Sequence, residues 1–154
     1  MLKRILVFYF VLTIIGTFPA LRAFSQYLNA PANPDYLQQY VEADPQNWNK
    51  SIIYVFYNNN LCDGCAAAMG MIYNIYEQNY SNQYSYFEIN YEDPGEFNFQ
   101  TDFDLTQPLN IVLVRVRDGL NMGSYKIENP QIWMSDPSYF TQNILTQINN
   151  FFNS

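Results

Sequence analysis

The only two cysteines of the chain lie three positions apart, in the sequence Cys62-Asp63-Gly64-Cys65. Two thiols at this spacing can form a disulfide with each other and exchange it with other thiols, because a thiolate attacks a disulfide sulfur and forms a mixed disulfide. The chain contains no histidine, which excludes a catalytic histidine and a histidine-bound metal. The chemistry that these residue types favour is therefore thiol–disulfide exchange.

The cysteine pair stands between a predicted strand and a predicted helix. Residues Ser51–Tyr57 form an apolar, β-branched and aromatic run, which predicts a buried strand. After Cys65, apolar residues recur at spacings of three and four, which predicts an amphipathic helix. The positive end of a helix dipole stabilises a thiolate. Cys65 shares the apolar stripe of this helix and is expected to face inward, so we predict that Cys62 is the nucleophile and Cys65 the resolving thiol.

Four interpretations of the pair remain open from the residues alone: a catalytic dithiol, a structural disulfide, a site for a soft metal and an inactive relic. A disulfide across two intervening residues closes a very small loop, and the stabilisation expected from chain entropy grows with loop length. Zinc would lack the four ligands of its usual structural sites. Met69 and Met71 could be soft ligands for Cu(I), but Met69 at helical spacing is more typical of a core position. The catalytic dithiol is favoured, with no metal and no cofactor expected.

A second stretch supports the redox interpretation. Gln107-Pro108 precedes the apolar run Leu109–Arg117, which ends at Asp118-Gly119. Together with the order of strand, CxxC and helix, this stretch resembles the thioredoxin-like superfamily over about Asn33–Phe152. The resemblance implies an α/β fold with a central mixed β-sheet flanked by helices on both faces. It also implies a thiol–disulfide oxidoreductase that acts on protein thiols and disulfides, with a cis bond between Gln107 and Pro108 and the backbone of both residues presented to the substrate.

The residues around the cysteines differ from the pattern of that superfamily. Its usual tryptophan before the first cysteine is Leu61 here, and its Gly-Pro dipeptide is Asp63-Gly64. The carboxylate of Asp63 opposes the helix dipole, so we predict a pKa for Cys62 nearer the roughly 7 of thioredoxin than the roughly 3.5 of a strong oxidant. Reduction or isomerisation of disulfides is therefore favoured. The alternative function is a non-enzymatic binding or adaptor domain on the same fold.

Further elements are predicted on both sides of this region. A short helix is expected from Asn33-Pro34 to Val41, and a strand over Tyr84–Asn90. An acidic stretch with interleaved phenylalanines follows from Tyr91 to Leu105, which predicts a solvated loop with its phenylalanines turned inward.

The C-terminal third of the chain carries clear turn and capping signals. Asp118-Gly119 predicts a hairpin turn, with Met122–Ile127 as the antiparallel partner strand. Asp136-Pro137 is typical of a helix start. Apolar residues at helical spacing then predict a final amphipathic helix; they are Phe140, Ile144, Ile148 and Phe151.

The N-terminus has the pattern of an export signal. Lys3-Arg4 precedes an uncharged apolar run at residues 5–21, and Ala23-Phe24-Ser25 offers a small-x-small cleavage site. We expect residues 1–25 to be a signal peptide, or alternatively an N-terminal membrane anchor, and residues 26–154 to form one thioredoxin-like domain. The folded domain is therefore expected to be exported to the periplasm or to the extracellular space, with a possible membrane tether through residues 5–21.

The charge balance argues against two classes of partner. The chain has a formal net charge of −7, and removal of the three cations in residues 1–25 would take it to −10. A surface of this sign repels nucleic acids and anionic lipid headgroups. Protein thiols and disulfides, with an unidentified redox partner, are the expected partners.

Overall fold

The computed structural model describes residues 45–93 and 97–154. The predicted export signal and the predicted helix from Asn33-Pro34 to Val41 lie outside these residues, as do residues 94–96 of the acidic stretch. Within the described part of the chain, no helix is both long enough and apolar enough to span a bilayer.

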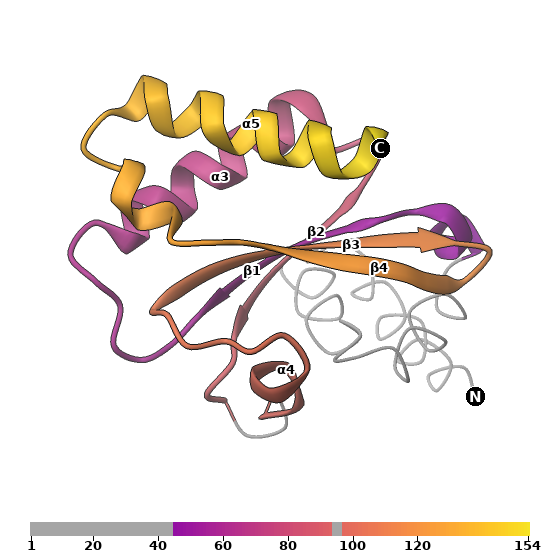
Figure 1. The fold of residues 1–154 in the computed structure, drawn as a ribbon, viewed down its shortest axis with the longest axis horizontal. Coiled ribbons are helices and arrows are strands. Elements are labelled where there is room, and N and C mark those ends of the chain that lie inside the picture. The colour runs from indigo at the N-terminus through magenta and orange to yellow at the C-terminus, as the bar shows by residue number, and fades with distance from the viewer. Residues whose placement is uncertain (1–44, 94–96) are drawn as a thin grey trace, which may run out of the picture.

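A four-stranded mixed sheet forms the centre of the molecule (Figure 1). Its strands are β1 (Ile52–Tyr57), β2 (Ser85–Asn90), β3 (Leu109–Arg117) and β4 (Leu120–Ile127), and they lie in the order β2-β1-β3-β4. β1 and β2 are parallel, whereas β3 is antiparallel to β1 and to β4. The predicted strands are confirmed, with ends that differ from the prediction by one or two residues.

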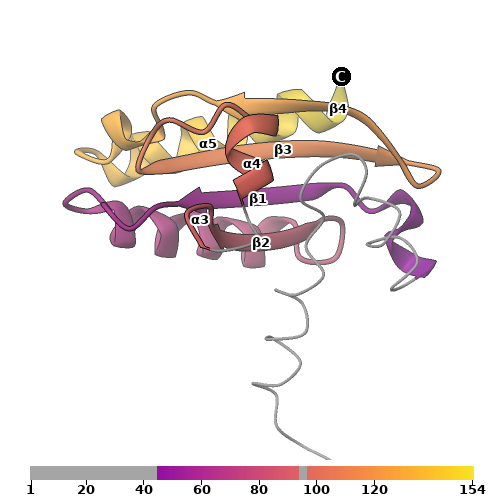
Figure 2. The ribbon, with the colours of Figure 1, turned by 90° about the horizontal axis from the view of Figure 1, so that it is seen from below.

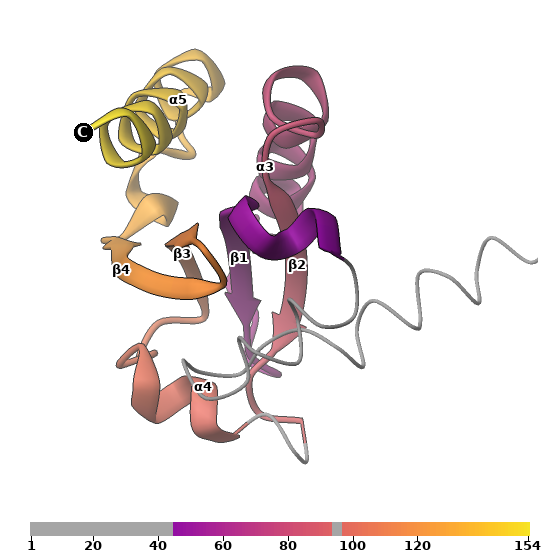
Figure 3. The same cartoon turned by 90° about the vertical axis from the view of Figure 1, so that its right-hand side faces the viewer.

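Helices cover both faces of this sheet. The helices are α3 (Cys65–Asn79), α4 (Phe97–Asp102) and α5 (Pro137–Asn153), with 3₁₀ turns η2 (Pro45–Asn49) and η3 (Pro130–Trp133). α3 and α5 lie side by side on one face, and α4 lies on the opposite face (Figures 2 and 3). α3 is the crossover that joins the parallel strands β1 and β2. The predicted fold class, a central mixed sheet flanked by helices on both faces, is confirmed.

The central strand β1 is buried on both of its faces. Ile53 and Val55 pack in the cluster that contains residues of α3 and α5, whereas Tyr54 and Phe56 pack against α4. Alternate side chains of a strand point to opposite faces. A continuous apolar run is therefore what a strand between two helical layers requires.

The hairpin and the helix start predicted in the C-terminal third are both confirmed. Asp118 and Gly119 have φ angles of 51° and 71°, and two positive φ values are what a two-residue type I′ turn needs. Asp136 is the N-cap of α5, and its carboxylate accepts hydrogen bonds from the backbone N–H groups of Ser138 and Tyr139, both at 3.0 Å. Local sequence signals therefore set both of these boundaries.

The acidic stretch after β2 differs from its prediction as a loop, because it contains the helix α4. Phe99 is fully buried in this region, and Phe103 is half-buried. The ring of Phe99 lies 4.9 Å from that of Phe56, centroid to centroid, and the ring of Phe103 lies 5.7 Å from it. The inward orientation of these two phenylalanines is confirmed. Their packing onto β1 supplies the tertiary contacts that make a six-residue helix stable, since an isolated helix of that length is unstable in water.

Candidate functional site

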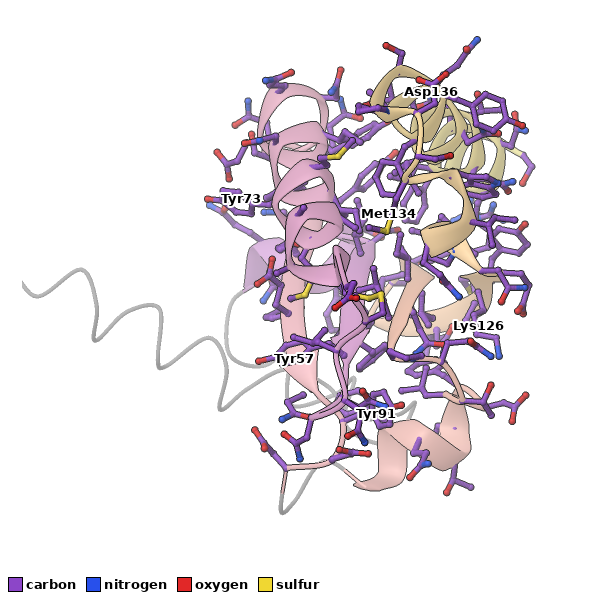
Figure 4. The ribbon with its side chains drawn as sticks, turned by 90° about the vertical axis from the view of Figure 1, so that its left-hand side faces the viewer. Tyr57, Tyr73, Tyr91, Lys126, Met134 and Asp136 are labelled. Atoms are coloured by element: carbon purple, nitrogen blue, oxygen red, sulfur yellow. A yellow bond between two sulfur atoms is a disulfide. The ribbon has the colours of Figure 1, made fainter. Side chains whose placement is uncertain are left out.

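Cys62 and Cys65 are joined by a disulfide, with their Cα atoms 5.2 Å apart (Figure 4). β1 ends at Tyr57, and a short loop leads from it to Cys62, while Cys65 is the first residue of α3. The disulfide therefore lies at the carboxyl end of the central strand β1, at the N-terminus of the crossover helix. The structure is that of the oxidised protein.

The two cysteines differ in exposure in the way the helical pattern predicts. The side chain of Cys65 is fully buried, whereas Cys62 is half-buried in the loop before the helix. Cys65 donates its backbone N–H to the carbonyl oxygen of Cys62 at 2.9 Å, which holds the two residues in a tight turn. Cys62 is therefore the more accessible cysteine of the pair, and Cys65 is enclosed by the core.

Gly64 makes the turn into α3 possible. It is the N-cap of the helix with a φ of 85°, a value that residues with a Cβ rarely adopt. A proline at this position, as in the superfamily's Gly-Pro dipeptide, has a φ fixed near −65° and is incompatible with this turn. The local path of the chain through the CxxC motif therefore depends on Gly64.

Met134 is a residue of this site that the sequence analysis did not identify. It follows η3, and a Cβ added to Gly64 would lie 2.7 Å from the Cε atom of Met134 (Figure 4). Met134 also packs against the same core cluster as Cys62, Met69 and Met71. The terminal methyl group of Met134 therefore lies close to Gly64, between the cysteines. No periodicity or spacing in the sequence points to it, since it lies in a loop and reaches the motif only through the fold.

Asp63 is exposed, beside the half-buried sulfur of Cys62. Its carboxylate makes no capping hydrogen bond, because the N-cap position is taken by Gly64. Among residues 45–93 and 97–154, no group of three or more metal-binding side chains of the His, Cys, Asp and Glu types is present. Asp63 is therefore an exposed carboxylate on the residue that follows Cys62.

The loop that contains Gln107 and Pro108, here called the proline loop, differs from its prediction. The structure contains no cis peptide bond in the described residues, so the Gln107–Pro108 bond is trans and the cis prediction is wrong. Three donors hold these two carbonyls: Asn58 N–H to Pro108 O at 3.3 Å, and Tyr91 O–H and Asn110 Nδ2 to Gln107 O at 3.1 and 2.7 Å. Both carbonyl oxygens are therefore hydrogen-bonded while the bond is trans. An X–Pro bond favours the trans form over the cis form by about 0.5–1 kcal/mol. The role of Gln107 and Pro108 in substrate binding, which the resemblance linked to a cis bond, stays a prediction.

Gln107 nevertheless lies in the polar framework around the site. Gln131 of η3 donates its Nε2 to Gln107 Oε1 at 3.5 Å, and its own Oε1 is buried without a donor among the described residues. Asn58, which binds Pro108, stands at the end of β1 on the way to Cys62. The proline loop is therefore tied both to the segment that leads to the cysteines and to the turn that places Met134.

Comparisons with known proteins give distant structural similarity. No family model and no curated protein matches the chain. Thioredoxin f2 of Chlamydomonas reinhardtii aligns with 77% of this chain and 92% of its own, at 11% identity and a TM-score of 0.49. A thioredoxin of Fasciola hepatica aligns with 62% of this chain and 82% of its own, at 13% identity and a TM-score of 0.43.

The fold assignment rests on the topology described above. The strand order, the parallel β1-α3-β2 crossover and the antiparallel β3-β4 hairpin are those expected of the thioredoxin-like arrangement, and the cysteine pair lies where that arrangement requires it. The chain has a thioredoxin-like fold with a CxxC motif at the N-terminus of its crossover helix.

Proposed function

We propose that this protein is a thiol–disulfide oxidoreductase that uses Cys62 and Cys65 to reduce or isomerise disulfides of other proteins. One observation carries the proposal: the two cysteines form a disulfide at a helix N-terminus, with Cys62 accessible and Cys65 enclosed. A purely structural disulfide has no need of this asymmetry. A dithiol that must attack an external sulfur and then resolve the product does need it.

The exchange proceeds in two steps that balance electrons and protons. In the reduced protein, the Cys62 thiolate attacks one sulfur of a substrate disulfide, which forms a mixed disulfide and releases the other substrate sulfur as a thiolate. The Cys65 thiol loses its proton and attacks Cys62 Sγ, so that the Cys62–Cys65 disulfide forms and the second substrate thiolate leaves. Two electrons pass from the protein to the substrate, and a dithiol protein or a low-molecular-weight thiol must return them.

Trapping of the mixed disulfide tests this proposal. In Cys65→Ala the second step is blocked, so Cys62 should remain bonded to its substrates and give adducts that disappear on reduction. The matched control is Cys62→Ala, which keeps one thiol but places it in the buried position and should trap almost nothing. Equal trapping by both variants would contradict the assigned roles, and absence of any Cys62-dependent adduct would favour a non-enzymatic adaptor.

We further propose that the domain acts after export. The support is the N-terminal pattern of Lys3-Arg4, the apolar run at residues 5–21 and Ala23-Phe24-Ser25. Stable disulfides are also favoured in oxidising compartments outside the cytosol. The intact mass of protein recovered from its native host should correspond to a chain without the first 23 or 25 residues. A mass that retains them would indicate a membrane anchor instead.

A further inference from the structure

A polar pocket of about 250 Å³ lies at the end of the sheet opposite to the disulfide. Here β1 begins and β3 ends, close to η2 and to the last turn of α5 (Figure 3). The residues that line it include Arg115, Arg117, Asn49, Ser51 and Ser154. Because Ser51 and Cys62 lie beyond opposite ends of β1, this pocket is separate from the redox site.

Arg115 is held rigidly at the wall of this pocket. Its Nη2 donates to the carbonyl oxygen of Phe151 and to Ser154 Oγ, the latter at 2.9 Å. The guanidinium also lies over the Phe151 ring, with Cζ at 4.8 Å from the ring centroid. Its Nε is buried and has no acceptor among the described residues. The charge of Arg115 is therefore partly removed from water, and the two acceptors of its Nη2 are uncharged groups.

Neither arginine of the pocket has a carboxylate partner in residues 45–93 and 97–154. The ion pairs found there both belong to Lys126, which lies 3.6 Å from Asp104 and 3.7 Å from Glu128. This is unexpected in a chain with fourteen carboxylates and seven cations. No aspartate or glutamate is among the lining residues, so the pocket is a positive site on an acidic protein.

The uncharged polar side chains of the pocket, Asn49 and Ser51, have hydrogen-bond donors left, because their oxygens already accept backbone N–H groups. Asn49 Oδ1 already accepts the backbone N–H of Asp118 at 2.9 Å, which leaves its amide Nδ2 to donate. Ser51 Oγ already accepts the backbone N–H of Val116 at 3.0 Å, which leaves its hydroxyl proton. Arg115 and Arg117 are two residues apart on β3, and alternate side chains of a strand point to the same face. Arg115, Arg117, Asn49 and Ser51 therefore all line one small space.

We propose that this pocket binds a small oxyanion, of the size of a phosphate or carboxylate group. Guanidinium groups bind such oxyanions through paired N–H donors, and these charge-assisted bonds are stronger than neutral ones. An anion in the pocket would also supply a carboxylate-like counter-charge, which neither arginine has within residues 45–93 and 97–154. A cation would meet two positive charges there and no acidic side chain.

Calorimetric titration of the oxidised protein with inorganic phosphate, at constant ionic strength in chloride buffer, tests the proposal. Phosphate should bind at one site, and Arg117→Gln should raise its Kd at least tenfold, because one of the two guanidinium groups is removed. Arg117 is exposed, so its replacement leaves the packing of Arg115 intact. The matched control is Lys126→Gln, which removes the same charge where it is already paired with Asp104. Its Kd should stay within twofold of the unchanged protein.

A parallel titration with acetate separates the two sources of such an anion. Tighter binding of phosphate assigns the pocket to a phosphorylated ligand, and tighter binding of acetate assigns it to a carboxylate ligand. Absence of binding by both anions, or equal weakening by Arg117→Gln and Lys126→Gln, would overturn the proposal. Because the Cys62–Cys65 disulfide is not involved, these results are independent of the trapping experiment.

Discussion

Asp63 places a carboxylate next to the accessible sulfur of the disulfide. A negative charge there disfavours the Cys62 thiolate, so it disfavours the reduced form, whereas the positive end of α3 has the opposite effect. We therefore expect a reduction potential closer to about −270 mV than to about −120 mV. This value would suit a protein that reduces or isomerises disulfides.

Asp63→His should raise the reduction potential of the protein by about 20 mV. The substitution removes a like charge, a change of about 1 kcal/mol for two charges about 4 Å apart in water, and about 30 mV corresponds to about 1.4 kcal/mol. Equilibration with glutathione buffers measures the potential. Glu77→His is the matched control, because Glu77 is exposed near the far end of α3, and it should leave the potential nearly unchanged.

Gly64→Ala should lower the free energy of unfolding by about 1–2 kcal/mol, because at a left-handed φ the Cβ of alanine lies too close to a backbone carbonyl oxygen. The new Cβ would also force Met134 to move. Gly70→Ala is a matched control with the opposite expected sign. Gly70 lies inside α3 with nothing within 4 Å of the added Cβ, so this change should stabilise the protein by about 0.5–1 kcal/mol. Urea unfolding of the oxidised proteins measures both, and a neutral Gly64→Ala would contradict the conformation assigned to the motif.

At the level of the elements, the start of α5 depends on a single side chain. Asp136→Ala removes the acceptor of two backbone N–H groups, those of Ser138 and Tyr139, and should cost about 1 kcal/mol of stability. Asp136→Ser keeps a capping oxygen and should lose much less. Urea unfolding measures both losses from the shift of the midpoint, with an unchanged m-value. An equal loss in the two variants would show that the charge at the helix N-terminus, rather than the capping bond, is responsible.

At the scale of the whole molecule, the stability of the fold should decrease at alkaline pH. Burial raises the pKa of five tyrosines above its ordinary value of 10.0; these are Tyr57, Tyr76, Tyr80, Tyr84 and Tyr91. The folded state therefore holds these protons more tightly than the unfolded state does. Their contribution is complete below the unfolded pKa of about 10 and is lost as the pH rises through the higher folded values.

Urea unfolding of the oxidised protein between about pH 8 and pH 11 measures this loss, since the upper end lies above the unfolded tyrosine pKa. Tyr84→Phe keeps a ring that can stack on Phe152 but has no proton to lose, so its stability should fall less steeply over the same range. A midpoint that is independent of pH up to about 11 would contradict the burial of these hydroxyl groups.

Much of the architecture was determined by the sequence alone, because its signals are local. The apolar run of β1, the Asp118-Gly119 turn and the Asp136-Pro137 helix start each depend on residues next to one another in the chain. The inward position of Cys65 follows in the same way, from the spacing of apolar residues along α3. Propensity, turn geometry and helix periodicity act over a few residues, so the printed sequence is sufficient for them.

Only the tertiary structure decided the features that depend on contacts between distant segments. α4 is a helix because Phe99 and Phe103 pack on β1. The sequence of residues 97–102 alone does not predict this packing. The Gln107–Pro108 bond is trans in a loop whose carbonyls are held by donors from other segments. Met134 reaches Gly64 through the turn η3, and Arg115 and Arg117 meet Asn49 and Ser51 through the pairing of β3 with β1. Such contacts depend on the packing of the whole chain, so they cannot be predicted from neighbouring residues in the sequence.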